Sequence, residues 1–187
     1  MTTRTTTTGH HQSAIVLHGS CLCKAVKFEI KIPKGVDRPI KLYQCHCVLC
    51  QKQSGSTSNT ATIIREENLT WKTKDNNNSI SKWVKPSGFT SHFCNTCGCP
   101  TPNNLRNLPY YWIPMGLIDG ETDDKSSFLK QHKQPKIVTH ICVNSKASWD
   151  KFQAEIVESS SKRDNEQVEA YDEMPPSIDD FINSIIP

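Results

Sequence analysis

The sequence contains no long hydrophobic run, and this absence and two others exclude several classes of protein. No stretch approaches the roughly 20 consecutive apolar residues that a membrane-spanning helix needs. Residues 1–12, MTTRTTTTGHHQ, lack the apolar segment of a secretory signal, so we expect a cytoplasmic chain with reduced thiols. No dense run of Lys and Arg with interleaved aromatic residues occurs, which disfavours nucleic-acid binding. We therefore expect neither a membrane nor a nucleic acid as a partner.

Length and charge fit one small domain with an acidic end. The 187 residues are 35% hydrophobic, which suits a single domain with a modest core. Residues 158–187 hold eight acidic and two basic residues, a charge of −6, so the net charge of +3 leaves +9 on residues 1–157. A basic body of this kind is compatible with an anionic substrate.

The pattern of apolar residues predicts a mainly β domain. In residues 26–32, VKFEIKI, apolar and charged side chains alternate with the period of two that is typical of a strand. The Thr-rich residues 1–12 are predicted to be a disordered arm, residues 13–157 the domain, and residues 158–187 an acidic arm. Further short strands, separated by turn-forming residues, are predicted at 40–46, 60–65, 69–73, 81–85, 110–118 and 136–143.

The acidic arm ends in a predicted short helix, residues 177–186, SIDDFINSII. Ser177 can cap its first turn, with Asp180 at the third helical position. Because so short a helix is marginal alone, we expect its apolar face to dock on its own domain or on a second subunit, which would give a homo-oligomer. Recognition of a different partner is the alternative. The apolar face consists of Ile178, Phe181, Ile182 and Ile185.

Nine cysteines are the main chemical feature of the chain, and eight of them fall in three tight clusters. An odd count with C-x-C and C-x-x-C spacings favours metal binding over a disulfide framework. Thiolates bind Zn²⁺ tetrahedrally; four of them close a structural site, whereas three leave a reactive position open. The cysteines stand at positions 21, 23, 45, 47, 50, 94, 97, 99 and 142.

Two arrangements fit these spacings, and spacing alone does not choose between them. The first is a single ribbon-like site built from two C-x-x-C pairs, Cys47/Cys50 and Cys94/Cys97. The second leaves fewer thiols unused, because it makes two sites. Its closed site consists of Cys21, Cys23, Cys94 and Cys97, and its open site of Cys45, Cys47 and Cys50.

Five segments resemble, in this order, the glutathione-dependent formaldehyde-activating enzyme family, which also contains the centromere protein V-like domain. The resemblance implies an Mss4-like fold of β-sheets held by zinc, with glutathione as substrate or co-substrate. It also implies the second arrangement, with two Zn²⁺ ions per chain, one structural and one reactive. The segments are GSCLCKAVKFEI (19–30), CHCVLCQKQSGS (45–56), FCNTCG (93–98), GLIDG (116–120) and HICVNSKASWDKF (140–152).

Two positions depart from the pattern of this family. Cys99 stands where Ser is common, and Gln51 stands where Arg is common. Both lie within or beside the motifs that the resemblance places around the substrate. They therefore bear on the identity of the substrate more than on the metal sites.

The residues after the three-cysteine cluster are candidates for a glutathione pocket. Lys52, Gln53, Ser54 and Gly55 are predicted to form a polar turn. Such a turn could hold the carboxylates or the backbone of glutathione, or could simply be solvated. Cys99 could face the same pocket or be buried as a small apolar residue.

Two further residues are assigned from their positions on predicted strands. His46 lies between two of the reactive cysteines, and strand alternation points it away from them. We therefore expect it to pack or to position its neighbours, rather than to act as a base or a fourth ligand. Cys142 lies in an apolar strand and is expected in the core.

These assignments predict a zinc-dependent carbon–sulfur lyase. A glutathione thiol at an open zinc position would lose its proton and could add to an aldehyde; in reverse, the same sulfur would be a leaving group. Cys45, Cys47 and Cys50 are then the catalytic residues, acting through bound zinc. The substrate would be S-hydroxymethylglutathione or a larger glutathione conjugate from detoxification or secondary metabolism. The alternative is a non-catalytic zinc module that binds protein or nucleic acid.

Overall fold

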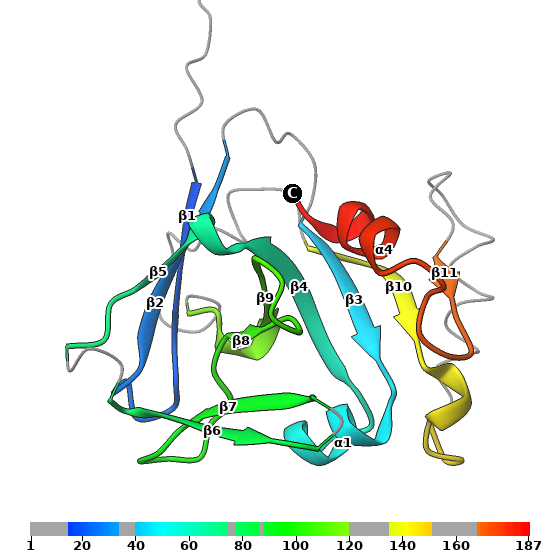
Figure 1. Cartoon of the computed structure of the whole chain (residues 1–187), viewed down its shortest axis with the longest axis horizontal. Helices are drawn as coiled ribbons and strands as arrows, with labels where there is room; N and C mark the ends of the chain where they lie inside the picture. Colours follow the sequence, from blue (N-terminus) through cyan, green and yellow to red (C-terminus); the bar gives the residue numbers. More distant parts are fainter. Residues whose placement is uncertain (1–14, 34–39, 75–77, 87, 120–134, 151–167) are drawn as a thin grey trace, which may run out of the picture.

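The described part of the chain is built mainly from β-strands, as the sequence predicts (Figure 1). The computed structural model describes residues 15–33, 40–74, 78–86, 88–119, 135–150 and 168–187. The expected N-terminal arm and the first ten residues of the acidic arm lie outside these ranges. The domain limits at residues 13, 157 and 158 therefore stay predictions.

The largest sheet has six strands in the order β11-β10-β3-β4-β9-β8. β10 runs parallel to β3 and to β11, and the other neighbours are antiparallel. In the register of β3 and β10, Cys45 pairs with Ile141, so both strands end at the same edge of the sheet. The strands span Lys41–Cys45 (β3), Asn59–Arg65 (β4), Asn103–Asn104 (β8), Tyr110–Pro114 (β9), Lys136–Ile141 (β10) and Glu169–Ala170 (β11).

Two smaller sheets complete the β structure of the described residues. One is antiparallel and contains β1 (Ile15–Ser20), β2 (Lys27–Ile32) and β5 (Leu69–Trp71). The other is a hairpin of β6 (Ile80–Val84) and β7 (Thr90–Cys94). The alternation predicted for β2 is confirmed, because its apolar side chains are buried and its two lysines are exposed.

Alternation along the central strands gives the six-stranded sheet two apolar faces. On β3, Leu42 packs with the sheet of β1, β2 and β5, whereas the next residue, Tyr43, packs on the opposite side. On β4, Ile63 and Ile64 divide in the same way. Both faces therefore need cover, which the smaller sheet provides on one side and the C-terminal helix on the other.

Helix α4 (Ile178–Ile185) covers the second face, as the sequence predicts. The hydroxyl of Ser177 accepts a hydrogen bond from the backbone N–H of Asp180 at 3.1 Å, which caps the helix. Phe181 is buried and packs edge-to-face on Tyr43, with ring centroids 5.1 Å apart. The apolar face thus docks on its own domain and is not accessible to a second subunit, so the structure gives no support to a homo-oligomer through it.

Helix α1 (Val48–Ser54) corrects the prediction of a polar turn at residues 52–55. Cys47 caps its start, and Gly55 ends it in the left-handed conformation with φ 65°. The first three residues of the predicted turn therefore belong to the helix.

No helix in the described ranges is long and apolar enough to cross a bilayer. The remaining helical turns are 3₁₀: η1 (Glu66–Asn68), η2 (Met115–Leu117) and η3 (Val143–Ser145).

Candidate functional site

The structure brings seven of the nine cysteines into two separate clusters, the groupings of the second arrangement. In each cluster the sulfur atoms lie within 4.8 Å of one another, so each could hold a metal ion. We call them the four-thiol cluster and the three-thiol cluster. The four-thiol cluster is Cys21, Cys23, Cys94 and Cys97, and the three-thiol cluster is Cys45, Cys47 and Cys50.

The four-thiol cluster has the spacing that a tetrahedral metal site requires. The sulfur of Cys23 lies 3.6 Å from that of Cys21 and 3.7 Å from that of Cys94. A tetrahedral ion with Zn–S bonds of about 2.3 Å separates its sulfurs by about 3.8 Å. The backbone N–H of Val26 also donates to the sulfur of Cys21 at 3.3 Å, an interaction that stabilises a thiolate. The donor set and its spacing fit zinc.

Two turns deliver these four sulfurs from different sheets. Cys21 and Cys23 follow β1, whereas Cys94 ends β7. The turn after β7 is closed by a hydrogen bond from the N–H of Gly98 to the carbonyl of Cys94, with Gly98 at φ 71°. Hydrogen bonds from the backbone N–H of Cys99, the larger effect, and of Cys23 lower the pKa of Cys97 to about 6. The cluster therefore brings the β6–β7 hairpin and the β1–β2 sheet together, and the thiolate is favoured on Cys97.

The three-thiol cluster is built at the junction between β3 and α1. Cys45 is the last residue of β3, Cys47 caps α1, and Cys50 lies in its first turn. The backbone N–H of Cys50 donates to the sulfur of Cys47 at 3.4 Å. The two cysteines of the C-x-x-C motif are therefore the N-cap residue of α1 and the residue whose N–H it caps. Cys45 is buried, whereas Cys47 and Cys50 are partly exposed. The cluster thus has one buried side and one side that solvent can reach.

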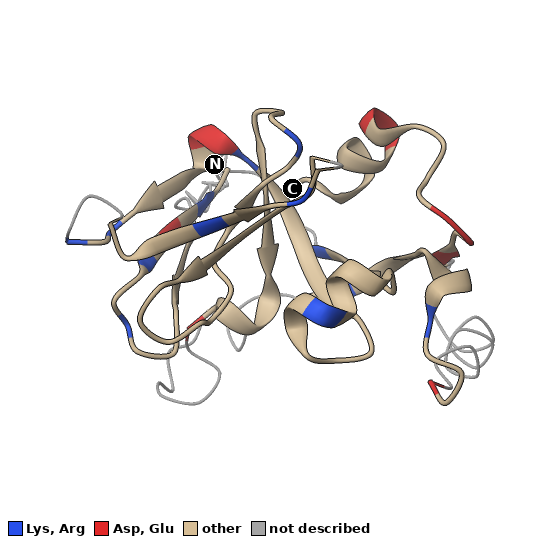
Figure 2. Cartoon of the chain, turned by 60° about the horizontal axis from the view of Figure 1, so that its bottom comes forward, with Lys and Arg blue, Asp and Glu red and all other residues tan. Residues whose placement is uncertain are grey.

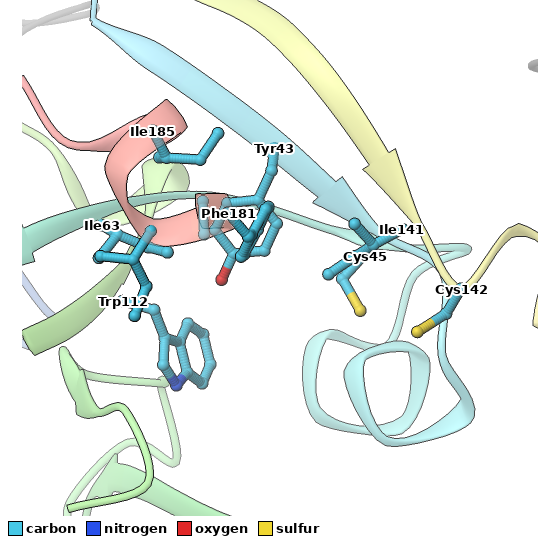
Figure 3. Packing of buried hydrophobic residues seen from close by; sticks show 10 residues of the cluster. Tyr43, Cys45, Ile63, Trp112, Ile141, Cys142, Phe181 and Ile185 are labelled. Atoms are coloured by element: carbon cyan, nitrogen blue, oxygen red, sulfur yellow. The ribbon is translucent and has the colours of Figure 1, made fainter. Parts of the chain in front are cut away.

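A neighbouring thiol, Cys142, also faces this cluster and was missed by the sequence analysis. Cys142 is buried among core residues, as predicted, but its sulfur points toward that of Cys45 (Figure 3). Contacts with Cys142, Cys45 and Cys50 lower the pKa of Cys47 well below its usual value, because adjacent S–H groups stabilise its thiolate. The cluster therefore favours a thiolate on Cys47.

His46 is held on the opposite side of β3 from the thiols, as strand alternation predicts. It is fully buried, and its Nε2 lies 3.1 Å from Nδ1 of His140 on β10. Its Nδ1 lies 3.8 Å from a carboxylate oxygen of Asp150. Burial lowers the pKa of His46, and burial together with the neighbouring His46 lowers that of His140 to about 4, so both rings are neutral at pH 7. These contacts hold the segment between Cys45 and Cys47 against β10.

The candidates for a glutathione pocket on α1 differ in whether their side chains already make hydrogen bonds within the protein. Lys52 is exposed in the last turn of the helix. The amide of Gln53 donates to the hydroxyl of Ser91 at 2.8 Å, which ties α1 to β7. The hydroxyl of Ser54 donates to a backbone carbonyl one turn earlier, also at 2.8 Å, and Gly55 caps the helix. Of these four residues, Lys52 has the side chain most available to a ligand.

Cys99 lies at the four-thiol cluster rather than beside the three-thiol cluster. It is partly buried and packs against the cluster of Cys21, Val26 and Cys94. Burial raises the pKa of its thiol. The structure therefore does not bring Cys99 together with the other glutathione-pocket candidates.

Gln51 is a site residue that the sequence marked only as a departure from the family's pattern. Its amide nitrogen donates to the carbonyl of His46 at 2.6 Å and to the carbonyl of Ser145 at 2.8 Å. One side chain thus links helix α1, the segment between two cluster cysteines, and the η3 turn. The contact joins residues 94 apart in the sequence, which no local pattern could reveal.

The fold and the two clusters define a class of proteins: a mainly β domain that could hold one metal ion in a closed thiol site and another in an open one. The profile of the family described as "Glutathione-dependent formaldehyde-activating enzyme" matches residues 16–143 of the 187. The chain belongs to this family, which supports a glutathione-related enzymatic activity.

A crystal structure of a Rhodobacter sphaeroides protein, a Northeast Structural Genomics target, is similar at 21% identity and a TM-score of 0.43. The similarity covers 63% of this chain and 97% of that one. No curated protein matches the chain.

Proposed function

We propose that the protein is a zinc-dependent lyase that forms or cleaves a carbon–sulfur bond in a glutathione adduct. The observation that carries the proposal is the contrast between the clusters: one has four mutually adjacent sulfurs, and the other has three with a solvent-accessible side. A protein that used metal only for folding would more naturally close both sites. The adduct would be S-hydroxymethylglutathione or a larger glutathione conjugate.

The donor atoms of both clusters suit zinc, so we propose two zinc ions per chain. All seven clustered donors are sulfur, which Zn²⁺ accepts readily in a tetrahedral arrangement. In the three-thiol cluster the ion would be held by Cys45, Cys47 and Cys50. Bound there, zinc would supply a Lewis acid that lowers the pKa of a substrate thiol and stabilises a departing thiolate.

The surrounding residues position the cluster and could orient the substrate. The N–H of Cys50 and the neighbouring thiols favour a thiolate on Cys47. His46 is buried against His140, away from the thiols, so we assign it a positioning role rather than that of a base. Lys52 is exposed on the same helix as Cys50, and its ammonium could bind a glutathione carboxylate.

The distribution of charge favours a small substrate over nucleic acid. Lys and Arg are scattered along the strands and loops of the described body instead of forming one continuous stripe (Figure 2). A stripe or patch of basic residues is the usual feature of a surface that follows a phosphate backbone. The acidic residues at the start of α4, Asp179 and Asp180, are exposed.

Turnover of defined adducts tests the proposal. Protein loaded with two equivalents of zinc is incubated with S-hydroxymethylglutathione and with bulkier S-substituted glutathiones, and thiol release is followed against the uncatalysed rate. We expect a rate above background for at least one adduct, and none for zinc-loaded Cys50→Ala protein that retains the fold. If no adduct is turned over faster than background, the lyase proposal is wrong.

A further inference from the structure

A fourth sulfur approaches the three-thiol cluster from a different strand. Cys142 is the first residue after β10, and β10 is paired in parallel with β3 so that Ile141 lies opposite Cys45. The N–H of His46 donates to the carbonyl of Ile141 at 3.0 Å, which fixes the ends of the two strands together. The fold therefore places Cys142 at the same sheet edge as the cluster, although the residues are far apart in the sequence.

The backbone at Cys142 turns its side chain toward the cluster. In a continued strand, Cys142 would alternate with Ile141 and face away from Cys45. Instead it adopts the left-handed conformation, with φ 57° and ψ 42°, which is unfavourable for a residue with a Cβ. Figure 3 shows the result: the sulfurs of Cys45 and Cys142 point toward one another beside α1.

This unfavourable backbone is held by specific contacts. The N–H of Cys142 donates to the carbonyl of Glu173 at 3.0 Å, and the carbonyl of Cys142 accepts from the N–H of Ser145 at 3.0 Å. The side chain of Gln51 holds the same turn by donating to the carbonyl of Ser145. Non-glycine residues in such a conformation persist where the surroundings determine it, and they are common at functional sites.

The chemical surroundings of Cys142 are sulfur as well as hydrocarbon. The thiol of Cys142 contacts those of Cys45 and Cys47, two of the three clustered sulfurs. Its sulfur does not lie within 4.8 Å of all three sulfurs of the three-thiol cluster. Cys142 thus stands just outside the three-thiol cluster, close to two of its members.

We propose that Cys142 is a displaceable fourth ligand of the metal at the three-thiol cluster, which occupies the open position until a substrate thiol replaces it. The inference rests on metal binding at this cluster, as in the proposed function, and adds what fills the fourth position at rest. The three fixed ligands come from one segment, residues 45–50, whereas Cys142 comes from another strand. It can therefore leave without moving the other three.

The exchange balances without an oxidant or a second reactant. The incoming thiol gives up its proton as it becomes a thiolate, and Cys142 takes up one proton as it leaves. No bond to carbon is made or broken in this step. The resting position would also be protected from water and from unrelated thiols until a substrate binds tightly enough to displace Cys142.

Cobalt substitution tests this proposal by a readout other than activity. Under reducing conditions, Co²⁺ replaces zinc, and the intensity of sulfur-to-cobalt charge-transfer absorption reports the number of thiolate ligands. The triple variant Cys45→Ala/Cys47→Ala/Cys50→Ala provides the spectrum of the four-thiol cluster alone, which is subtracted. In Cys142→Ala we expect the remaining intensity to fall by about one quarter, one thiolate of four.

Two matched variants make the spectral result specific. Cys99→Ala removes the one cysteine outside both clusters and the proposed ligand, so its cobalt spectrum should equal that of the wild type. Cys142→Ser keeps the side-chain size and must lose the same intensity as Cys142→Ala. An unchanged intensity in Cys142→Ala overturns the proposal, and so does a loss seen in Cys142→Ala but not in Cys142→Ser.

Glutathione then separates this inference from the proposed function. If both hold, glutathione restores the lost intensity in Cys142→Ala and binds that variant more tightly than the wild type, because nothing has to be displaced. If Cys142 changes the spectrum but glutathione does not affect it in either protein, Cys142 is a permanent ligand. That result overturns displacement by glutathione and the proposed glutathione chemistry together, whereas a spectrum insensitive to Cys142 overturns the ligand assignment and leaves the lyase activity to be judged by turnover.

Discussion

The two thiol clusters use the same kind of ligand in different structural settings. The four-thiol cluster takes its sulfurs from two turns on different sheets, and Cys23 and Cys94 are 71 residues apart. The three-thiol cluster takes all its sulfurs from one junction between a strand and a helix. The first is a cross-link between remote elements, whereas the second is a local feature of one segment.

This difference separates stability from chemistry. Around the four-thiol cluster the core is small: Cys21, Val26 and Cys94 are its buried members. The three-thiol cluster lies instead at the end of a larger core, in which α4 packs on β3 through Phe181 and Tyr43. The backbone that carries the three-thiol cluster is therefore supported by apolar packing, so a metal ion bound there would not be needed to hold the fold.

The largest expected effect comes from breaking the four-thiol cluster with Cys94→Ala. Cys94 is fully buried, and structural zinc in small domains contributes roughly 10–16 kcal/mol of apparent binding energy to folding. We expect the variant to be unfolded already at 25 °C, so that circular dichroism with zinc present shows no cooperative unfolding transition on heating. Cys99→Ala, which removes a partly buried thiol in the same region, should cost only about 1 kcal/mol. A wild-type melting curve for Cys94→Ala would show that this cluster is not a structural site.

The matching change in the three-thiol cluster, Cys50→Ala, should affect activity and not folding. Loss of groups that merely support a metal ligand costs about 10- to 100-fold, so loss of the ligand itself should cost at least about 100-fold in turnover. The apolar core beneath the cluster is unchanged, so the melting temperature should stay within a few degrees, about 1 kcal/mol in stability. Parallel assays of turnover and thermal unfolding check this. Unfolding as severe as that of Cys94→Ala would remove the distinction between the clusters.

Much of the fold was predictable because it depends on local patterns. The alternation in β2 put Phe28 and Ile30 in the core, and both are buried. Ser177 three residues before Asp180 predicted the cap of α4, and the hydrogen bond is present. Periodicity and caps act over a few residues, which one sequence displays directly.

The missed features depend on contacts between distant residues or on an unusual use of a side chain. The last residues of helix α1 were taken for a turn, because the helix is capped by the sulfur of Cys47 and Cys is not among the usual capping residues. Cys142 was predicted in the core, but its approach to the three-thiol cluster was not predicted. That approach depends on the parallel pairing of β10 with β3 and on a left-handed backbone. Neither property leaves a pattern in an apolar strand.

Gly19→Ala tests the packing between β1 and β2, the strands that lead into and out of the turn with Cys21 and Cys23. Gly19 lies opposite Phe28 in the β1–β2 pairing, and a Cβ at Gly19 would overlap the Phe28 ring. Overpacking of this kind costs about 1–3 kcal/mol, measurable by denaturant unfolding. Gly116→Ala is the control, because a Cβ there meets no atom within 4 Å, and it should stay within about 0.5 kcal/mol of wild type. Equal costs for both variants would contradict the packing argument.

Gln51→Met should give the smallest loss of stability, and it tests the hydrogen bonds beside the three-thiol cluster. Methionine keeps the length of the side chain but cannot donate to the carbonyls of His46 and Ser145, which should cost about 1–2 kcal/mol in stability. Gln44→Met, which removes one hydrogen bond to Ser58, should cost about 1 kcal/mol. Both are measured by denaturant unfolding.

The two glutamine variants should differ in their cobalt spectra. Without the contact to Ser145, the turn that carries Cys142 is no longer tied to α1, so Gln51→Met should lose part of the charge-transfer intensity that Cys142→Ala loses. Gln44 lies on the other side of β3 from Cys45, so Gln44→Met should leave that intensity unchanged. If Gln51→Met lowers stability and leaves the spectrum intact, the hydrogen bonds of Gln51 hold the fold but do not position Cys142. The three-thiol cluster would then keep its fourth sulfur through the backbone of Cys142 alone.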